Sequence, residues 1–244
     1  MLHYDWLSTT DIQEAFRTEI QEAGGTVLDA FDDSRRLFAR SVLPGLEEVR
    51  PRDKVRGGVA LRALETEVCV HPYVYRLVCR NGAIAAHALE SRCIKADDVP
   101  DPEDAIATIR ETVQACCADD VFTARAGEMR SAASMHATDM MLNMMAMLAH
   151  LPPHTRTQAM QSVLGQFASA GDSSRFGLMN AVTATARDTR DPELRWRLEE
   201  LGGSIPVRRT PRSPRGDALA EMQEELVLAS ADSTSGAGRR MMAS

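Results

Sequence analysis

Four basic residues alternate along the segment RPRDKVR: Arg50, Arg52, Lys54 and Arg56. In an extended strand every second side chain projects from the same face, at intervals of about 6.6 Å. This interval is close to the phosphate spacing of an extended single strand of nucleic acid, and cations that meet phosphates gain affinity by releasing counterions. We call these four residues the basic row. Its spacing predicts contact with a phosphate backbone.

Aromatic and basic residues further along the chain extend this predicted site. Tyr73 and Tyr75 offer rings on which bases can stack, and Arg62, Arg76 and Arg80 add positive charge. The predicted nucleic-acid-binding residues are therefore Arg50, Arg52, Lys54, Arg56, Arg62, Tyr73, Tyr75, Arg76 and Arg80. The same pattern also fits a solvated edge strand whose charges discourage edge-to-edge pairing, with both tyrosines half-buried.

The basic residues are concentrated in one part of an acidic chain. Residues 35–95 hold twelve Lys or Arg against six Asp or Glu, whereas residues 1–34 hold one Arg against eight acids. The whole chain has a formal charge of −7. A protein that only has to stay soluble can intersperse its charges. The segregation therefore favours an anionic partner for residues 35–95.

No motif for catalysis or cofactor binding is present. The sequence lacks the phosphate-binding loop G-x-x-x-x-G-K-[ST], the dinucleotide fingerprint G-x-G-x-x-G and the zinc motif H-E-x-x-H. One alternative pairs Cys79 with His71 or His87 as a nucleophile and its base, but a buried structural cysteine is the simpler interpretation. We therefore expect a protein that is not an enzyme and has neither a cofactor nor a metal site.

The cysteines and the apolar stretches indicate the compartment. Five cysteines, at 69, 79, 93, 116 and 117, form no C-x-x-C pair, which favours reduced thiols in a cytoplasmic protein over a disulfide framework. The N-terminus has no charged region followed by an apolar run, so we expect no signal peptide. The longest apolar stretch, residues 140–151, is far shorter than the roughly 20 residues that span a membrane.

The elements that would position the basic row follow from the periodicity of apolar residues. A helix is predicted over residues 9–23. Strands are predicted over 35–42, 55–64 and 67–70. Gly57-Gly58 indicates a bulge or the close approach of another backbone. Residues 72–80 fit a strand followed by an Asn81-Gly82 turn, but a helix that begins at Pro72 is slightly favoured.

From Asp101 onward the pattern is helical. Asp101 and Pro102 predict a capped helix start. Further helices are predicted over 122–149 (one long helix or two abutting ones), 157–170, 174–187 and 192 to the Gly202-Gly203 pair. Beyond Ile205 the composition shifts to Ser, Gly, Pro and Arg, which predicts a disordered tail over 206–244 with a short helix near 218–229.

Together these elements predict an α+β protein. Residues 1–205 form one domain with an N-terminal helix, a small antiparallel sheet over about 35–95 and a helical C-terminal half, followed by the tail.

Two segments within the predicted sheet resemble a known family. VRPRDKVRGGVALR (49–62) and HPYVYRLVCRNGAI (71–84) resemble the phage- and plasmid-like "domain of unknown function" family numbered 932. FGLMNAVTATARD (176–188) is similar to the C-terminal helix of that family, so the likeness covers residues 1–205. The order of elements is also similar in topology to that of phage single-strand annealing proteins. The resemblance implies the protein of a mobile element.

Two functions follow as expectations. The first is a non-enzymatic nucleic-acid-binding protein, an annealing or replication accessory factor whose partner is single-stranded nucleic acid. The alternative is an oligomeric protein-interaction module with no nucleic-acid role. Its basic face would meet an acidic surface, such as the N-terminal helix of a neighbouring copy in a homo-oligomer. Neither function involves a membrane.

Overall fold

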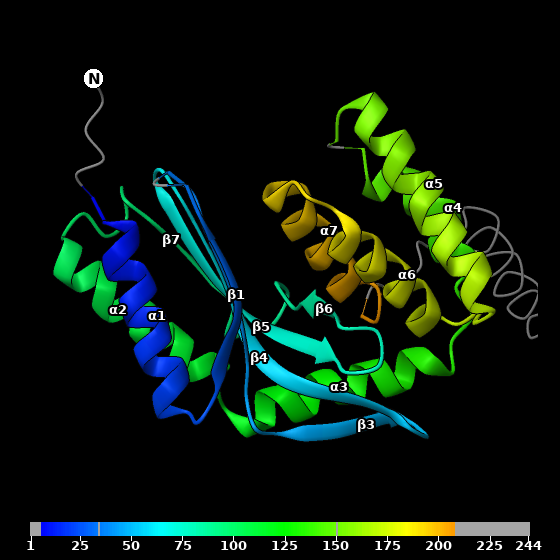
Figure 1. Cartoon of the computed structure of the whole chain (residues 1–244), viewed down its shortest axis with the longest axis horizontal. Coiled ribbons are helices and arrows are strands. Elements are labelled where there is room, and N and C mark those ends of the chain that lie inside the picture. The colour runs from blue at the N-terminus through cyan, green and yellow to red at the C-terminus, as the bar shows by residue number, and fades with distance from the viewer. Residues whose placement is uncertain (1–5, 34, 150, 208–244) are drawn as a thin grey trace, which may run out of the picture. The chain divides into compact units, whose positions relative to one another are not determined.

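The computed structural model of this chain describes residues 6–33, 35–149 and 151–207, all within one compact unit, Met1–Arg208. The fold is α+β as predicted, with an N-terminal helix, a seven-stranded antiparallel sheet and a helical C-terminal half (Figure 1). Residues 208–244, and with them the short helix predicted near 218–229, lie outside the described residues. Within the described ranges, none of the helices combines the length and apolar character that a membrane crossing needs.

The sheet contains more strands than the sequence predicts. Its strands are β1 (Thr26–Asp32), β2 (Leu37–Val42), β3 (Leu46–Arg50), β4 (Asp53–Leu64), β5 (Glu67–Arg76), β6 (Asn81–Ile84) and β7 (Arg92–Lys95). They are ordered β1-β2-β4-β5-β6, while β3 pairs with β4 and β7 pairs with β5. The predicted strands correspond to β2, β4 and the start of β5. Strands β1 and β3 carry many charged or exposed side chains and were not predicted.

For residues 72–80 the prediction slightly favoured a helix, and this prediction is wrong. Strand β5 continues through Arg76, and Asn81-Gly82 opens β6 instead of forming a turn. Both faces of β5 are covered, so the strand is apolar on both sides and lacks clear alternation. Pro72 lies between the part of β5 that pairs with β7 and the part that pairs with β6. A strand tolerates proline where no neighbouring strand needs its N–H.

Seven helices surround the sheet in the described part of the chain. They are α1 (Thr9–Glu22), α2 (Pro102–Cys116), α3 (Asp119–Ala133), α4 (Thr138–Met147), α5 (Pro153–Ala170), α6 (Arg175–Asp188) and α7 (Pro192–Ser204). Helix α1 confirms the predicted first helix, and the side chain of Asp101 caps α2 as predicted. The predicted segment 122–149 is two helices, α3 and α4, with a break at which His136 bridges to Ser174.

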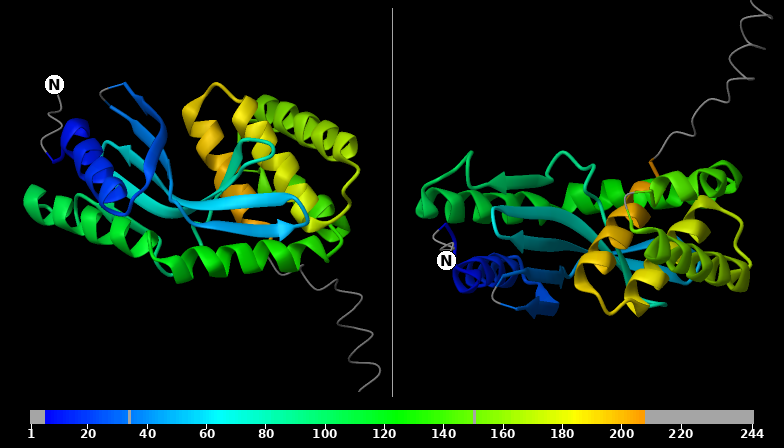
Figure 2. Two further views of the ribbon diagram at one scale, coloured as in Figure 1. Left: turned by 60° about the horizontal axis from the view of Figure 1, so that its bottom comes forward. Right: turned by 90° about the horizontal axis from the view of Figure 1, so that it is seen from above.

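Helices α1 and α2 cover one face of the sheet. Phe16 of α1 and Ile109 of α2 are buried against Val59 and Leu61, which point to the same side of β4. Helix α3 follows along this face (Figure 2). Gly58 confirms the predicted close approach of a backbone, because a Cβ there would lie 2.0 Å from the Ser41 carbonyl oxygen.

Helix α7 lies against the opposite face. Its Trp196 is fully buried, with ring centroids 6.1 Å from Phe38 and 5.7 Å from His71. The prediction that Gly202-Gly203 ends this helix is wrong, because both glycines lie inside its last turns. A Cβ on Gly203 would lie 2.0 Å from the Ile84 carbonyl oxygen, so glycine lets α7 contact the backbone of β6.

Candidate functional site

The basic row is folded into a hairpin. Strand β3 ends at Arg50, Arg52 lies in the turn with a φ of 67°, and β4 begins at Asp53. The register places Arg50 opposite Asp53. Directly paired residues share a face, so Arg50 points to the other side of the hairpin from Lys54 and Arg56. The prediction that all four cations of the basic row project from one face of an extended strand is therefore wrong.

Arg50 makes internal contacts. Its Nη1 donates to Asp172 Oδ2 at 2.5 Å, and its Nη2 donates to the Ala133 carbonyl and to Ser174 Oγ, both at 2.8 Å. Its guanidinium also lies 5.1 Å from the Phe176 ring centroid. Burial alone would raise the pKa of Asp172, but hydrogen bonds from Arg50 and Ser174 hold that pKa below its usual value. Arg50 thus joins the hairpin to α3 and α6.

Arg76 is also occupied. Its Nε and Nη2 donate to the two carboxylate oxygens of Asp53 at 2.7 and 2.6 Å, and its Nη1 lies 3.1 Å from Cys79 Sγ. This two-pronged contact is the strongest geometry that an arginine makes with a carboxylate. It fastens the end of β5 to the start of β4, so Arg76 is not presented to solvent as a phosphate ligand.

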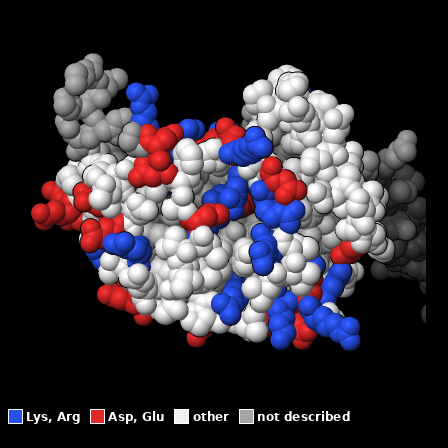
Figure 3. Space-filling view, viewed as in Figure 1, with Lys and Arg blue, Asp and Glu red and all other residues white. Residues whose placement is uncertain are grey.

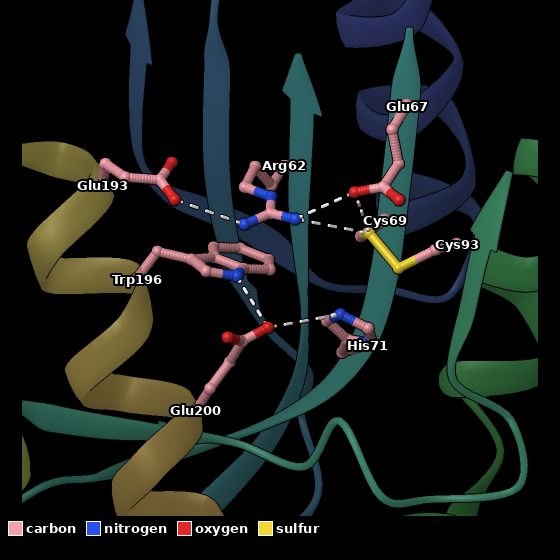
Figure 4. Close-up of a disulfide and its surroundings, with 8 residues drawn as sticks. All are labelled: Arg62, Glu67, Cys69, His71, Cys93, Glu193, Trp196 and Glu200. Atoms are coloured by element: carbon pink, nitrogen blue, oxygen red, sulfur yellow. Dashed lines mark hydrogen bonds and ion pairs between the residues drawn. A yellow bond between two sulfur atoms is a disulfide. The ribbon is translucent and has the colours of Figure 1, made fainter. Parts of the chain in front are cut away.

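Arg62 lies beneath α7. Its side chain is 14% exposed and pairs with Glu67 at 3.0 Å and with Glu193 at 3.4 Å (Figure 4). Its guanidinium lies 5.6 Å from the Trp196 ring. Tyr73 is buried as well, and burial raises its pKa far above the usual value. Tyr73 therefore cannot stack on a base in this conformation.

The remaining predicted residues gather at one end of the sheet. We call this group the basic end, and it consists of Arg52, Lys54, Arg56, Tyr75 and Arg80. The turn that carries Arg80 lies beside the hairpin, because the Leu77 N–H donates to the Lys54 carbonyl at 3.0 Å. Arg52, Lys54 and Arg80 are exposed, while Arg56 and Tyr75 are half-buried.

The basic end carries cations that are not ion-paired within residues 6–33, 35–149 and 151–207, although Glu48 lies directly opposite Lys54 in the hairpin. Across the described residues, none of its four cations forms an ion pair with an acidic side chain. Glu48 Oε1 accepts a hydrogen bond from the backbone N–H of Arg52 at 2.6 Å, which leaves the Arg52 guanidinium outside this contact. Blue side chains gather at the lower right of Figure 3, where the hairpin lies in Figure 1, with a few red ones among them.

A second group of charges, which the sequence did not predict, lies between the sheet and α7. Arg40 Nε donates to Glu199 Oε2 at 2.6 Å, and both side chains are almost fully buried. Arg195 pairs with the same carboxylate at 3.1 Å and with Asp29 at 2.9 Å. The one available sequence signal is that Glu199 shares a helix face with Trp196, three residues earlier.

One pair of cysteines is oxidised. The register of β5 and β7 places Cys69 opposite Cys93, and the two form a disulfide (Figure 4). The prediction that all five thiols are reduced is therefore wrong for this pair. The two cysteines are 24 residues apart in sequence, and only the unpredicted pairing of β7 with β5 brings them together. Cys79, Cys116 and Cys117 are free.

The nucleophile pair considered for Cys79 is not assembled. Cys79 lies against Arg76, whereas His87 contacts Glu128 at 3.4 Å. His71 faces Glu200, with 3.7 Å between its Nε2 and Oε1 of that residue. Burial, with a smaller contribution from Arg62, lowers the pKa of His71 to about 4, so its ring is neutral near pH 7.

Comparisons with known proteins add nothing to this geometry. No protein-family model, curated protein or solved structure matches the chain. The resemblance to the family numbered 932 therefore stays a prediction.

Proposed function

We propose that this protein binds single-stranded nucleic acid without being an enzyme, and that the basic end of the sheet is the contact surface. The observation that supports this most is the set of four cations, none paired with an acid in the described part of the chain, around a partly exposed tyrosine. An annealing or replication accessory role in a mobile element, and a cytoplasmic location, are part of this proposal.

The geometry around Tyr75 supports base stacking. Its direct cross-strand neighbours are Arg56 on β4 and Gly82 on β6. The Tyr73 phenol fills the place of a Gly82 side chain, since a Cβ there would lie 1.9 Å from the Tyr73 hydroxyl oxygen, so a base would stack on the part of the Tyr75 ring that stays exposed. Stacking of a base on an aromatic ring contributes roughly 1–3 kcal/mol and tolerates any sequence.

Phosphate contacts would come from the residues beside that ring. Lys54 and Arg56 lie on one face of β4, about 6.6 Å apart. Arg52 and Arg80 flank them in the two neighbouring turns. Arg50 and Arg76 would act indirectly, because their ion pairs hold the hairpin and the end of β5 in place. A fixed array loses less conformational entropy on binding than flexible side chains do.

Charge reversal at the basic end tests the proposal. Binding of labelled single-stranded DNA is followed by fluorescence anisotropy at several salt concentrations. The triple variant Arg52→Glu, Lys54→Glu, Arg56→Glu should bind much more weakly. It should also show a shallower dependence on salt, by about 2 in the log–log slope, because each lost phosphate contact contributes roughly 0.7.

A matched control separates local contact from net charge. Arg35, Arg92 and Lys95 are exposed basic residues at the opposite end of the sheet. Their reversal to Glu changes the net charge by the same amount. This control should keep a salt slope close to that of the unaltered protein. Equal effects of the two triple variants, or no binding by the unaltered protein, would contradict the proposal.

The alternative function, an oligomeric interaction module, is favoured by strand β1. Strand β1 lies at one edge of the sheet, and Val27, Leu28 and Phe31 are 37%, 41% and 40% exposed. An uncovered edge strand is a common site for pairing with another chain. Sedimentation analysis of Leu28→Lys tests this: loss of a dimer present in the unaltered protein would support the alternative, and a monomer in both would refute it.

A further inference from the structure

Three side chains with metal-ligating atoms meet at the α7-facing side of β5. Cys69 and His71 are two residues apart on β5 and point to the same face, and Cys93 lies opposite Cys69 on β7. Both Sγ atoms and one ring nitrogen of His71 lie within 4.8 Å of one another (Figure 4). We call these three residues the sulfur cluster.

The two ring nitrogens of His71 differ in their surroundings, and Nε2 lies 3.7 Å from Glu200 Oε1, slightly beyond hydrogen-bond distance. Its Nδ1 is buried and has no hydrogen-bond partner among the described residues. Its Nε2 faces Glu200, which also accepts a hydrogen bond from Trp196 Nε1 at 2.8 Å. Metal-bound histidines typically direct the second ring nitrogen to such a carboxylate. Nδ1 is thus the nitrogen that can bind a metal while Nε2 keeps its acidic neighbour.

The charges around the sulfur cluster suit a divalent cation. Arg62 Nη2 lies 3.7 Å from Cys69 Sγ, but Glu67, which pairs with Arg62 at 3.0 Å, offsets its charge. Two thiolates would then balance one divalent ion. Glu67 Oε2 is also 3.4 Å from Cys69 Sγ, close enough to supply a fourth, oxygen ligand after a small movement.

We propose that the reduced sulfur cluster binds a zinc ion through Cys69 Sγ, Cys93 Sγ and His71, and that the Cys69–Cys93 disulfide is the metal-free, oxidised form of the same site. Two thiolates, one imidazole and one oxygen are a ligand set that zinc accepts in tetrahedral geometry. Thiolate ligands also disfavour the hard cations magnesium and calcium.

The two forms interconvert by balanced chemistry. Zinc binding by the reduced form releases one proton from each thiol. Conversion of the zinc-bound form to the disulfide form needs an oxidant: a small-molecule disulfide accepts two electrons from the two zinc-bound thiolates. The Cys69–Cys93 bond forms, Zn²⁺ leaves, and two protons from solvent complete the two thiols derived from the oxidant. Cys93 is exposed, so an oxidant can reach it.

Metal binding by the full chain tests this inference directly. The protein is reduced with a phosphine, which becomes the phosphine oxide, and is then desalted without oxygen. Zinc affinity is measured by competition with a chromophoric chelator, and Co²⁺ serves as a spectroscopic probe. We expect one metal per reduced chain, with sulfur-to-cobalt charge-transfer absorption, and no binding by the oxidised chain.

Variants in the reduced state identify the ligands. Cys93→Ser removes an exposed sulfur on a short edge strand, so it should leave the circular dichroism spectrum unchanged while abolishing the charge-transfer band or weakening it strongly. Glu200→Gln should weaken zinc binding by about 10-fold or more, as outer-shell partners do. Cys79→Ser and Cys117→Ser should bind as the unaltered protein does. Failure of the reduced chain to bind zinc, or unchanged binding by Cys93→Ser, would overturn the inference.

Discussion

Arg50 and Asp172 are 122 residues apart in sequence and meet with 2.5 Å between Nη1 and Oδ2. The contact joins the end of β3 to the segment that precedes α6. Ser174, the N-cap of that helix, donates its backbone N–H to the same carboxylate and accepts from Arg50 through its hydroxyl. Arg50, the first member of the basic row, therefore belongs to the framework that positions the hairpin.

Replacing Arg50 should affect stability more than nucleic-acid binding. Arg50→Met removes the guanidinium hydrogen bonds to Asp172 and to the Ala133 carbonyl, whereas the Ser174 N–H still donates to Asp172. Both acceptors are partly exposed, and hydrogen bonds of this kind contribute about 1–3 kcal/mol together. We expect the free energy of unfolding, measured in urea, to fall by that amount while the salt slope of DNA binding is unchanged. Arg52→Met is the control. It should lower the salt slope of DNA binding and leave the free energy of unfolding unchanged. A lower salt slope for Arg50→Met would show that Arg50 contacts phosphate.

The same ion pair predicts a pH dependence. The pKa of Asp172 in the folded protein is below its usual value of 3.8, so the unfolded chain binds a proton there more readily. The stabilisation from Asp172 is complete well above pH 3.8 and is lost as the pH falls through the folded pKa. Asp172→Asn should therefore be less stable than the unaltered protein at neutral pH, and the difference should shrink below about pH 4. A difference that stays constant across this range would contradict the assignment.

Local sequence patterns predicted the fold where one physical signal dominated. Asp101 caps α2 as a polar N-cap does, and Gly58 marks the close approach of a backbone. Residues 72–80 were ambiguous because a strand covered on both faces has no alternation to distinguish it from a short helix. The choice between them depends on partners in β4 and β6, which a local pattern does not contain.

The candidate site was harder to predict, because pairing partners decide which charges are exposed. Asp53 interrupts the basic row in sequence, yet in the structure it holds Arg76. Arg50 pairs with Asp172, and Arg62 pairs with Glu193. In both pairs the two residues are more than a hundred positions apart in sequence. Composition alone gives a net charge for a segment, but it cannot tell which cations are already neutralised by distant acids.

Tyr75 and Tyr73 should respond differently to substitution. Tyr75→Leu keeps an apolar side chain but removes the ring, so we expect single-stranded DNA affinity to fall by roughly 1–3 kcal/mol for one lost stack. Tyr73→Phe should leave affinity unchanged, because that ring is 2% exposed. Both are measured by anisotropy at one salt concentration. Equal affinity of Tyr75→Leu and the unaltered protein would remove stacking from the proposed mode of binding.

Two helical glycines should have opposite effects when changed to alanine. A Cβ on Gly203 would lie 2.0 Å from the Ile84 carbonyl oxygen, so α7 must move away from β6 to admit it. The cost should exceed the gain in helix propensity, and overpacking of this kind typically destabilises by about 1–3 kcal/mol. A Cβ on Gly165 of α5 meets nothing within 4 Å.

Gly165→Ala is therefore the matched control and should stabilise by up to about 1 kcal/mol, because alanine favours the helix. Unfolding in urea measures both changes. Since α7 carries Trp196, Glu199 and Glu200, displacement of this helix should also disturb the charges beneath it. Gly203→Ala should accordingly weaken zinc binding by the reduced sulfur cluster, while Gly165→Ala should not. If Gly203→Ala is as stable as the unaltered protein, the close contact between α7 and β6 is not a determinant of the fold.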